Sequence, residues 1–161
     1  MANARYRPGA DKTPLRRDGR GRTLCRWCGR PVPPPKQTFC SAECVHQWKL
    51  RTSGTYLRDA LFKRDQGVCA QCGADTESMK IALRLARRES PERYHAVRET
   101  FRLTEAEALK SLWHADHIVE VADGGGACGL ENLQILCWKC HKAKTADQRR
   151  ARAALRRGKG S

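Results

Sequence analysis

Apolar residues recur at helical spacing in the middle of the chain. They lie three or four positions apart in SGTYLRDALFKRD, residues 53–65, and in ESMKIALRLARRE, residues 77–89, so each stretch is predicted to form a helix. Ser90 and Pro91 interrupt the second pattern, and a further helical segment runs to about residue 103. Thr104 and Glu107 then have the spacing of a capping box, which predicts another helix start.

The pattern changes to alternation in the last third of the chain. HIVEV, residues 117–121, alternates and is rich in β-branched residues, which predicts a strand. DGGG, residues 123–126, allows the positive φ angles of a tight connection. LENLQILC, residues 130–137, predicts a returning strand, and the stretch from Trp138 to Leu155 is rich in helix-forming residues. The predicted order is therefore strand, strand, helix.

Composition shows that this chain has little material for one large core. Of 161 residues, 40% are hydrophobic and 30% are charged. No apolar run approaches the roughly 18 residues of a membrane span, and the first residues lack the apolar centre of a secretory signal. We therefore expect a protein that is not secreted and does not bind membranes, located in the cytoplasm, or in the nucleus if the source is eukaryotic.

Nine cysteines offer another source of stability, since eight of them form four close pairs. In a reducing compartment such pairs indicate metal sites rather than disulfides, because both thiolates of a pair can reach one tetrahedral zinc. We predict two structural zinc sites, with no open coordination position for catalysis. The first set is Cys25, Cys28, Cys40 and Cys44, and the second is Cys69, Cys72, Cys137 and Cys140.

The first set predicts a treble-clef-like zinc finger in residues 24–52. Cys25 and Cys28 lie in a tight turn before Gly29, and Ser41 is a candidate N-cap that places Cys44 in the first turn of a helix. His46 is an alternative fourth ligand. Cys128 belongs to neither set, and we interpret it as a small packed residue.

The formal net charge is +15, and the excess is concentrated at both ends. Residues 1–24 carry seven Arg or Lys against two Asp, and residues 139–161 carry nine against one. Basic segments of this kind gain affinity for polynucleotides by displacing counterions from phosphates. DNA, duplex or branched, is the predicted partner, with RNA less favoured; the oligomeric state is left open. The phosphate contacts are predicted to be Lys139, Lys142, Lys144, Arg149 and Arg150.

The stretch from Trp113 to Thr145 combines several motifs in one order. It reads WHADHIVEVADGGGACGLENLQILCWKCHKAKT, with Asp-His, three glycines, Asn-Leu-Gln and Cys-x2-Cys-His-Lys in succession. Together with the pair at residues 69–72, this stretch resembles the HNH endonuclease family, and it is especially similar to the HNH modules that end fork-remodelling annealing helicases. The resemblance covers residues 69–145 and implies a ββα-metal nuclease fold bracketed by zinc-binding cysteines.

The resemblance also implies a role for four residues. His117 corresponds to the general base, a task that suits an imidazole with an ordinary pKa near ~6.5. Asp116 and His141 correspond to ligands of one catalytic divalent ion, Mg²⁺ or alternatively Mn²⁺ or another metal, and Asn132 would fix the loop and the His117 ring. Because neighbouring strand residues face opposite ways, irregular backbone is predicted near Asp116. His114 is assigned no catalytic task.

These observations predict a small α+β, zinc-stabilised protein in four parts. They are a disordered basic arm (1–23), the four-cysteine finger (24–52), an HNH nuclease domain with inserted helices (53–148) and a basic tail (149–161). The predicted activity is metal-dependent hydrolysis of DNA phosphodiester bonds, with nicking as the expected outcome. The alternative is a non-catalytic, zinc-dependent DNA- or RNA-binding module with a nuclease-like fold.

Overall fold

The computed structural model of this chain describes residues 13–126 and 128–158. The chain divides into two compact units: Met1–Ala60 with Glu120–Asn132, and Leu61–Val119 with Leu133–Ser161. Most of the predicted disordered arm, residues 1–12, lies outside the described residues. Residues 13–23 contain a hydrogen-bonded turn in which the Asp18 side chain accepts from the backbone amides of Arg20 and Arg22. No described helix has the length and apolar character that a bilayer crossing requires.

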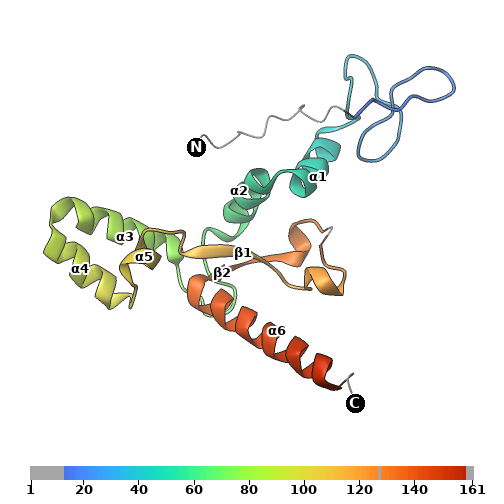
Figure 1. The fold of residues 1–161 in the computed structure, drawn as a ribbon. Helices are drawn as coiled ribbons and strands as arrows, with labels where there is room; N and C mark the ends of the chain where they lie inside the picture. The colour runs from blue at the N-terminus through green and yellow to red at the C-terminus, as the bar shows by residue number, and fades with distance from the viewer. Residues whose placement is uncertain (1–12, 127, 159–161) are drawn as a thin grey trace. The chain divides into compact units, whose positions relative to one another are not determined.

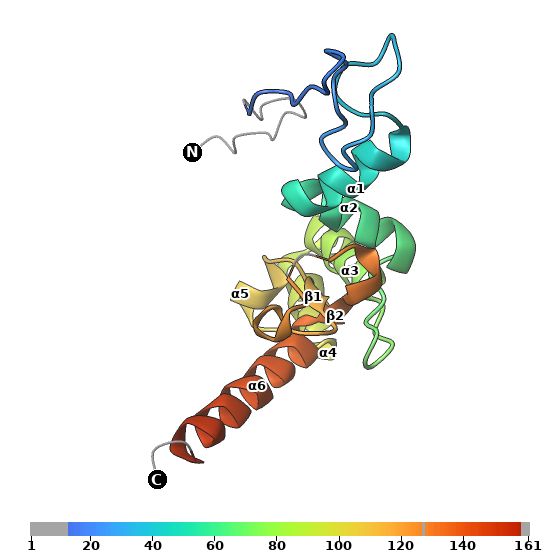
Figure 2. The same ribbon diagram turned by 90° about the vertical axis from the view of Figure 1, so that its right-hand side faces the viewer.

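The first unit begins with loops and continues into helices (Figure 2). An isolated bridge between Leu24 and Pro31 closes the turn that carries the first cysteine pair. Helix α1, Ala42–Thr52, starts where the Ser41 hydroxyl accepts a hydrogen bond from the Cys44 amide at 3.1 Å, which confirms the predicted cap. Helix α2, Gly54–Asp65, follows at the predicted place, and the second unit begins within it at Leu61. Two 3-10 helices, η1 at Val121–Asp123 and η2 at Leu130–Asn132, form the remainder.

The second unit contains a group of helices that packs on its own core. Helices α3 (Thr76–Glu89) and α4 (Pro91–Thr100) pack against each other, and the short helix α5 (Glu105–Ala108) starts with the predicted Thr104 capping box (Figure 1). Helix α5 consists of a single turn. The buried residues at the centre of this core are Leu83, Leu103, Ala108 and Leu112.

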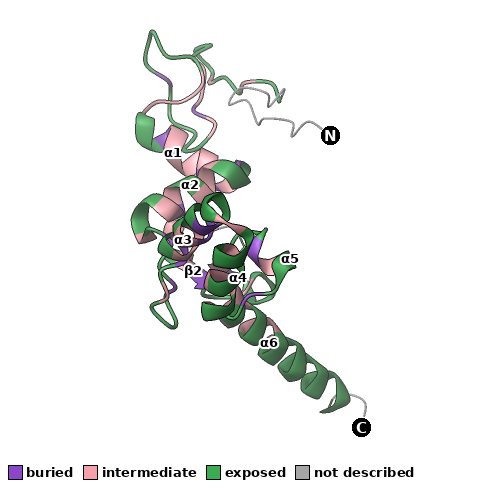
Figure 3. Cartoon of the chain, turned by 90° about the vertical axis from the view of Figure 1, so that its left-hand side faces the viewer, coloured by how far each residue is buried: buried purple, intermediate pink, exposed green. Residues whose placement is uncertain are grey.

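The second unit also contains the predicted ββα element. Strand β1, Trp113–His117, pairs antiparallel with β2, Leu133–Cys137, and helix α6, Trp138–Gly158, begins directly after β2 (Figure 1). Beyond its first turns α6 is exposed, and every described residue from Arg149 onward is exposed (Figure 3). The small α+β class and the order strand, strand, helix are therefore as predicted.

The first strand does not lie where its sequence pattern placed it. Residues 117–121 were expected to form it, but β1 is the more polar segment WHADH and ends at His117. Ile118 and Val119 form a bend and are 54% and 49% exposed. Asp116 is part of a regular ladder opposite Gln134, so the chain departs from strand geometry just after the position predicted. Pairing with β2, rather than β-branched content, selects the strand.

Candidate active site and metal centres

The first cysteine set converges in the first unit. The four sulfur atoms of Cys25, Cys28, Cys40 and Cys44 all lie within 4.8 Å of one another. Cys25 and Cys28 are held by a turn in which the Gly29 amide donates to the Cys25 carbonyl at 3.0 Å, and Gly29 has a φ of 73°. All of the cysteines in the chain are free, so this set has the donor atoms of a tetrathiolate site. The treble-clef assignment of the connecting chain stays a prediction.

Hydrogen bonds around the first set favour the ionised thiolate form of Cys25 and Cys28. The backbone amide and then the guanidinium of Arg30 lower the pKa of Cys28 to about 6. Burial opposes ionisation of Cys25, but amide hydrogen bonds outweigh it and lower its pKa. Hydrogen bonding to Cys44 and then to Cys28 raises the pKa of Cys40 to about 12. Four crowded thiols therefore ionise together only when a cation balances their charge.

The second cysteine set converges in the second unit, although 64 residues separate its two pairs. The sulfurs of Cys69, Cys72, Cys137 and Cys140 also lie within 4.8 Å of one another. Cys137 ends β2, Cys140 lies in the first turn of α6, and the Ala70 amide donates to the Ile135 carbonyl at 2.8 Å. Trp138 packs against this set and against the helical core. The fold thus brings the two distant pairs together where β2 ends and α6 begins.

Two histidines from the ββα element stack on each other. His114 lies on β1 two residues before Asp116, so both side chains belong to one face of the strand. The ring of His141, on the first turn of α6, lies parallel to that of His114, with centroids 4.4 Å apart and an interplanar angle of 16°. The structure therefore places Asp116 and His141 on elements that meet, with His114 as an additional member.

The Asp116 carboxylate is held by two neighbours. Lys144, one turn after His141 on α6, forms an ion pair with Oδ2 of Asp116, and its ammonium also donates to the His117 carbonyl. Gln134, the cross-strand partner of Asp116, donates to the same oxygen at 3.0 Å. The side chains of Asp116 and Lys144 are only 13% and 22% exposed. These contacts fix the carboxylate at the junction of β1 and α6.

His117 and Asn132 belong to different units. His117 is the last residue of β1 and pairs with Leu133, and within residues 13–126 and 128–158 no hydrogen bond or ion pair to its ring is found. Asn132 donates its side-chain amide to the Gly125 carbonyl at 3.0 Å. This bond links Asn132 to the glycine-rich connection that it is predicted to fix. The predicted effect of Asn132 on the His117 ring stays a prediction.

The five predicted phosphate contacts all lie on α6, but in different environments. Lys144 is engaged by Asp116 and His117, as described above. Lys139 is exposed, with its ammonium 5.1 Å from the centroid of the Trp138 ring. Lys142, Arg149 and Arg150 are exposed, and Arg150 pairs with Asp147. The exposed four remain candidates for phosphate contact.

The donor atoms near β1 suit a hydrated divalent ion better than a closed metal site. Among the described residues, Asp116 and His141 belong to no converging group of three or more His, Cys, Asp or Glu side chains. One carboxylate and one imidazole would leave most coordination positions of a divalent ion to water and substrate, as in many Mg²⁺ sites, although an imidazole nitrogen is a ligand more typical of transition metals. The chemistry of this donor pair therefore admits a hydrated ion, and the described residues build no closed metal site around it.

Sequence reasoning missed two contributors to this site, His114 and Gln134. His114 is assigned no catalytic task from the sequence because it departs from the Glu or Gln that similar proteins carry there, yet its spacing of two from Asp116 indicates the same strand face. Gln134 follows from the ladder register, since it is the residue opposite Asp116. Register was not predictable here because the strand itself was misplaced.

Comparison with known proteins finds similarity to HNH endonucleases in a family model, in whole proteins and in a solved structure. The family model for the HNH endonuclease matches residues 101–147. The DNA annealing helicase and endonuclease ZRANB3 of Mus musculus is 34% identical over 157 residues, covering 87% of this chain and 15% of that protein; the Homo sapiens protein is 32% identical over 176 residues, covering 98% and 16%. The chain thus spans about a sixth of these relatives. The crystal structure of the human ZRANB3 HNH domain is 32% identical, with a TM-score of 0.45, covering 66% of this chain and 97% of that one.

Proposed function

Because this chain belongs to the HNH endonuclease family, we propose that it is a metal-dependent endonuclease that hydrolyses DNA phosphodiester bonds. The observation that carries the proposal is the ββα element, in which Asp116 and His141 lie on adjoining elements and His117 ends the strand. DNA is inferred as the substrate because the similar proteins are named as DNA annealing helicases and endonucleases.

We assign the general-base role to His117. An imidazole can take a proton from an attacking water at neutral pH, whereas Lys and Arg side chains are ordinarily cationic there. Two neighbouring residues can border one cleft where a strand ends, and β1 ends at His117. Lys144 holds the last peptide of the strand through the His117 carbonyl. This contact supports a fixed position for the backbone that carries the base.

Asp116 and His141 would hold the catalytic divalent ion, Mg²⁺ or another metal. The chemistry that such an ion supplies when bound is stabilisation of the negative charge that develops on the phosphate as the bond breaks. Asp116 is oriented for this by Gln134 and Lys144, and the His141 ring is oriented by its stacking on His114. Asn132 positions the connection before β2 and does not itself react.

The two cysteine sets would each hold one structural zinc ion. Sulfur-only donor sets favour zinc, and a tetrathiolate has no open position for substrate. In the second unit this ion would tie residues 69–72 to the start of α6, which carries His141. Reduced cysteines of this kind fit a cytoplasmic or nuclear location.

A plasmid assay tests the proposed activity. With Mg²⁺ or Mn²⁺ the protein is expected to convert supercoiled plasmid to the open-circular form, because one small site reaches one strand at a time. His117→Ala is expected to lower the rate by roughly 10²- to 10⁴-fold, the usual contribution of a general base. His95→Ala is the matched control, since His95 is an exposed residue of α4. Equal nicking by His117→Ala, or no nicking with any divalent ion, would favour a non-catalytic zinc-dependent binding module.

A further inference from the structure

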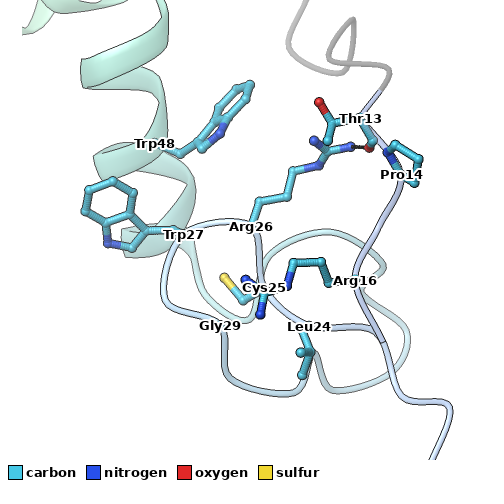
Figure 4. Close-up of a pocket in the computed structure, with 9 residues that line it drawn as sticks. All are labelled: Thr13, Pro14, Arg16, Leu24, Cys25, Arg26, Trp27, Gly29 and Trp48. Carbon is cyan, nitrogen blue, oxygen red and sulfur yellow. Dashed lines mark hydrogen bonds between the residues drawn. The ribbon is translucent and has the colours of Figure 1, made fainter. Parts of the chain in front are cut away.

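A second candidate binding site lies in the first unit, beside the first cysteine set. A pocket of about 270 Å³ is bordered by two tryptophans, two arginines and the turn that carries Cys25 and Gly29 (Figure 4). None of the lining residues is acidic. The complete lining consists of Thr13, Pro14, Arg16, Leu24, Cys25, Arg26, Trp27, Gly29 and Trp48.

Trp27 offers an aromatic surface at this pocket that is already held in place. The guanidinium of Arg51 lies over the indole, 4.4 Å from the ring centroid. Arg51 is itself fixed, because it donates to the backbone carbonyl and the side-chain oxygen of Gln47 at 3.0 and 2.7 Å. Trp27 nevertheless remains 39% exposed. A large aromatic ring that is supported on one side and accessible elsewhere is a suitable stacking platform.

The charges around Trp27 favour an anionic occupant. Residues 13–52 contain nine Arg or Lys and two acidic residues, and a zinc tetrathiolate would offset only two of the positive charges. Arg16 lines the pocket and is exposed, and no hydrogen bond or ion pair of its side chain is found among the described residues. Arg16 can therefore accept a phosphate without first breaking an internal contact. An acidic peptide would use the cations but would leave the indole without a flat partner.

We propose that this pocket binds an unpaired nucleotide of single-stranded DNA, with the base stacked on Trp27 and a phosphate next to Arg16. A paired base has its faces covered by its neighbours in the helix, so it cannot stack in a small pocket, whereas an unpaired base can. The site is separate from the proposed catalytic residues, all of which lie outside residues 13–52. Binding of single-stranded DNA at this pocket does not depend on cleavage. The proposed function is needed only for the further step that the bound strand belongs to the DNA that the nuclease site cleaves.

The test measures binding of fluorescent oligonucleotides to the full chain carrying His117→Ala, without added divalent ions. Trp27→Ala is expected to weaken binding of a 12-nucleotide oligo-dT about tenfold, the effect of losing one stacked base, and to leave a blunt duplex of equal length nearly unchanged. Trp27→Phe should retain part of the affinity. Arg16→Ala should weaken binding more than Arg20→Ala, a change of equal charge at an exposed residue outside the pocket.

The zinc content of each variant is compared with that of the unsubstituted chain, and an equal content verifies that the variant is folded. If Trp27→Ala fails this control, Arg16→Ala still tests the site. The proposal is overturned if Trp27→Ala and Arg16→Ala bind oligo-dT as the parent does, or if they weaken duplex binding equally. Tighter, Trp27-dependent binding of oligo-rU would overturn DNA as the occupant. Because the parent is the His117→Ala variant, none of these results depends on nuclease activity.

Discussion

The stability of the second unit should depend on the metal ion that we propose joins its two cysteine pairs. Cys72→Ala tests this dependence cleanly, since Cys72 is exposed and its truncation removes little packing. In the unfolded chain, bringing Cys72 to Cys137 closes a loop of 64 intervening residues, which costs about 4 kcal/mol in chain entropy. In the folded chain the four sulfurs already lie within 4.8 Å of one another. A zinc ion bound by these sulfurs would therefore favour the folded state by about this amount.

The expected result for Cys72→Ala is one zinc ion per chain instead of two, and a free energy of unfolding lower by about 4 kcal/mol. Zinc is measured by mass spectrometry of the metal, and stability by urea unfolding. Cys128→Ala is the matched control, because Cys128 belongs to neither set and should keep two zinc ions and nearly full stability. The reasoning is refuted if Cys72→Ala retains two zinc ions, or if it loses one with no change in the unfolding midpoint.

Two further predictions concern the ββα element. Lys144→Met should lower the free energy of unfolding by about 2 kcal/mol, because it leaves the largely covered Asp116 carboxylate without its ion pair. Lys142→Met, on the exposed surface of α6, should change the free energy of unfolding little. Urea unfolding of both variants tests this, and equal effects would contradict the role of the pair. Ile135→Ala should cost about 2–5 kcal/mol, because Ile135 is fully buried in β2, and Ile81→Ala, at a residue 42% exposed, should cost far less in the same thermal or urea measurement.

Local chemistry made several parts of this fold predictable. Ser41 and Thr104 cap helices where their sequences indicate, because capping depends on residues within one turn. Apolar spacing located α2 and α3, and the pairing of cysteines identified two sets whose sulfurs converge. The capping and spacing signals each lie within one short segment of the chain. The cysteine signal is clear because closely spaced cysteines have few roles other than metal binding or disulfide formation.

Features that depend on contacts between distant segments were not predictable. β1 is a polar segment because one of its faces carries site residues, so its alternation is hidden, while the exposed Ile118 and Val119 imitate a strand. Lys144 has the sequence character of a phosphate contact, but its partner Asp116 is 28 residues away and comes within reach only through the packing of α6 on β1. The pair could not be predicted because its two residues are far apart in the sequence, although an ion pair between Lys and Asp is ordinary chemistry.

Chemical rescue tests the central claim most directly, that His117 acts as the base of a metal-dependent nuclease. The measurement is the rate of plasmid nicking by His117→Ala as imidazole is added, with Asp116→Ala treated in the same way. We predict that imidazole raises the rate for His117→Ala in proportion to its concentration and leaves Asp116→Ala inactive, since a free base can replace a lost imidazole but not a lost carboxylate ligand. Equal responses of the two variants, or full activity of His117→Ala before imidazole is added, would contradict the account.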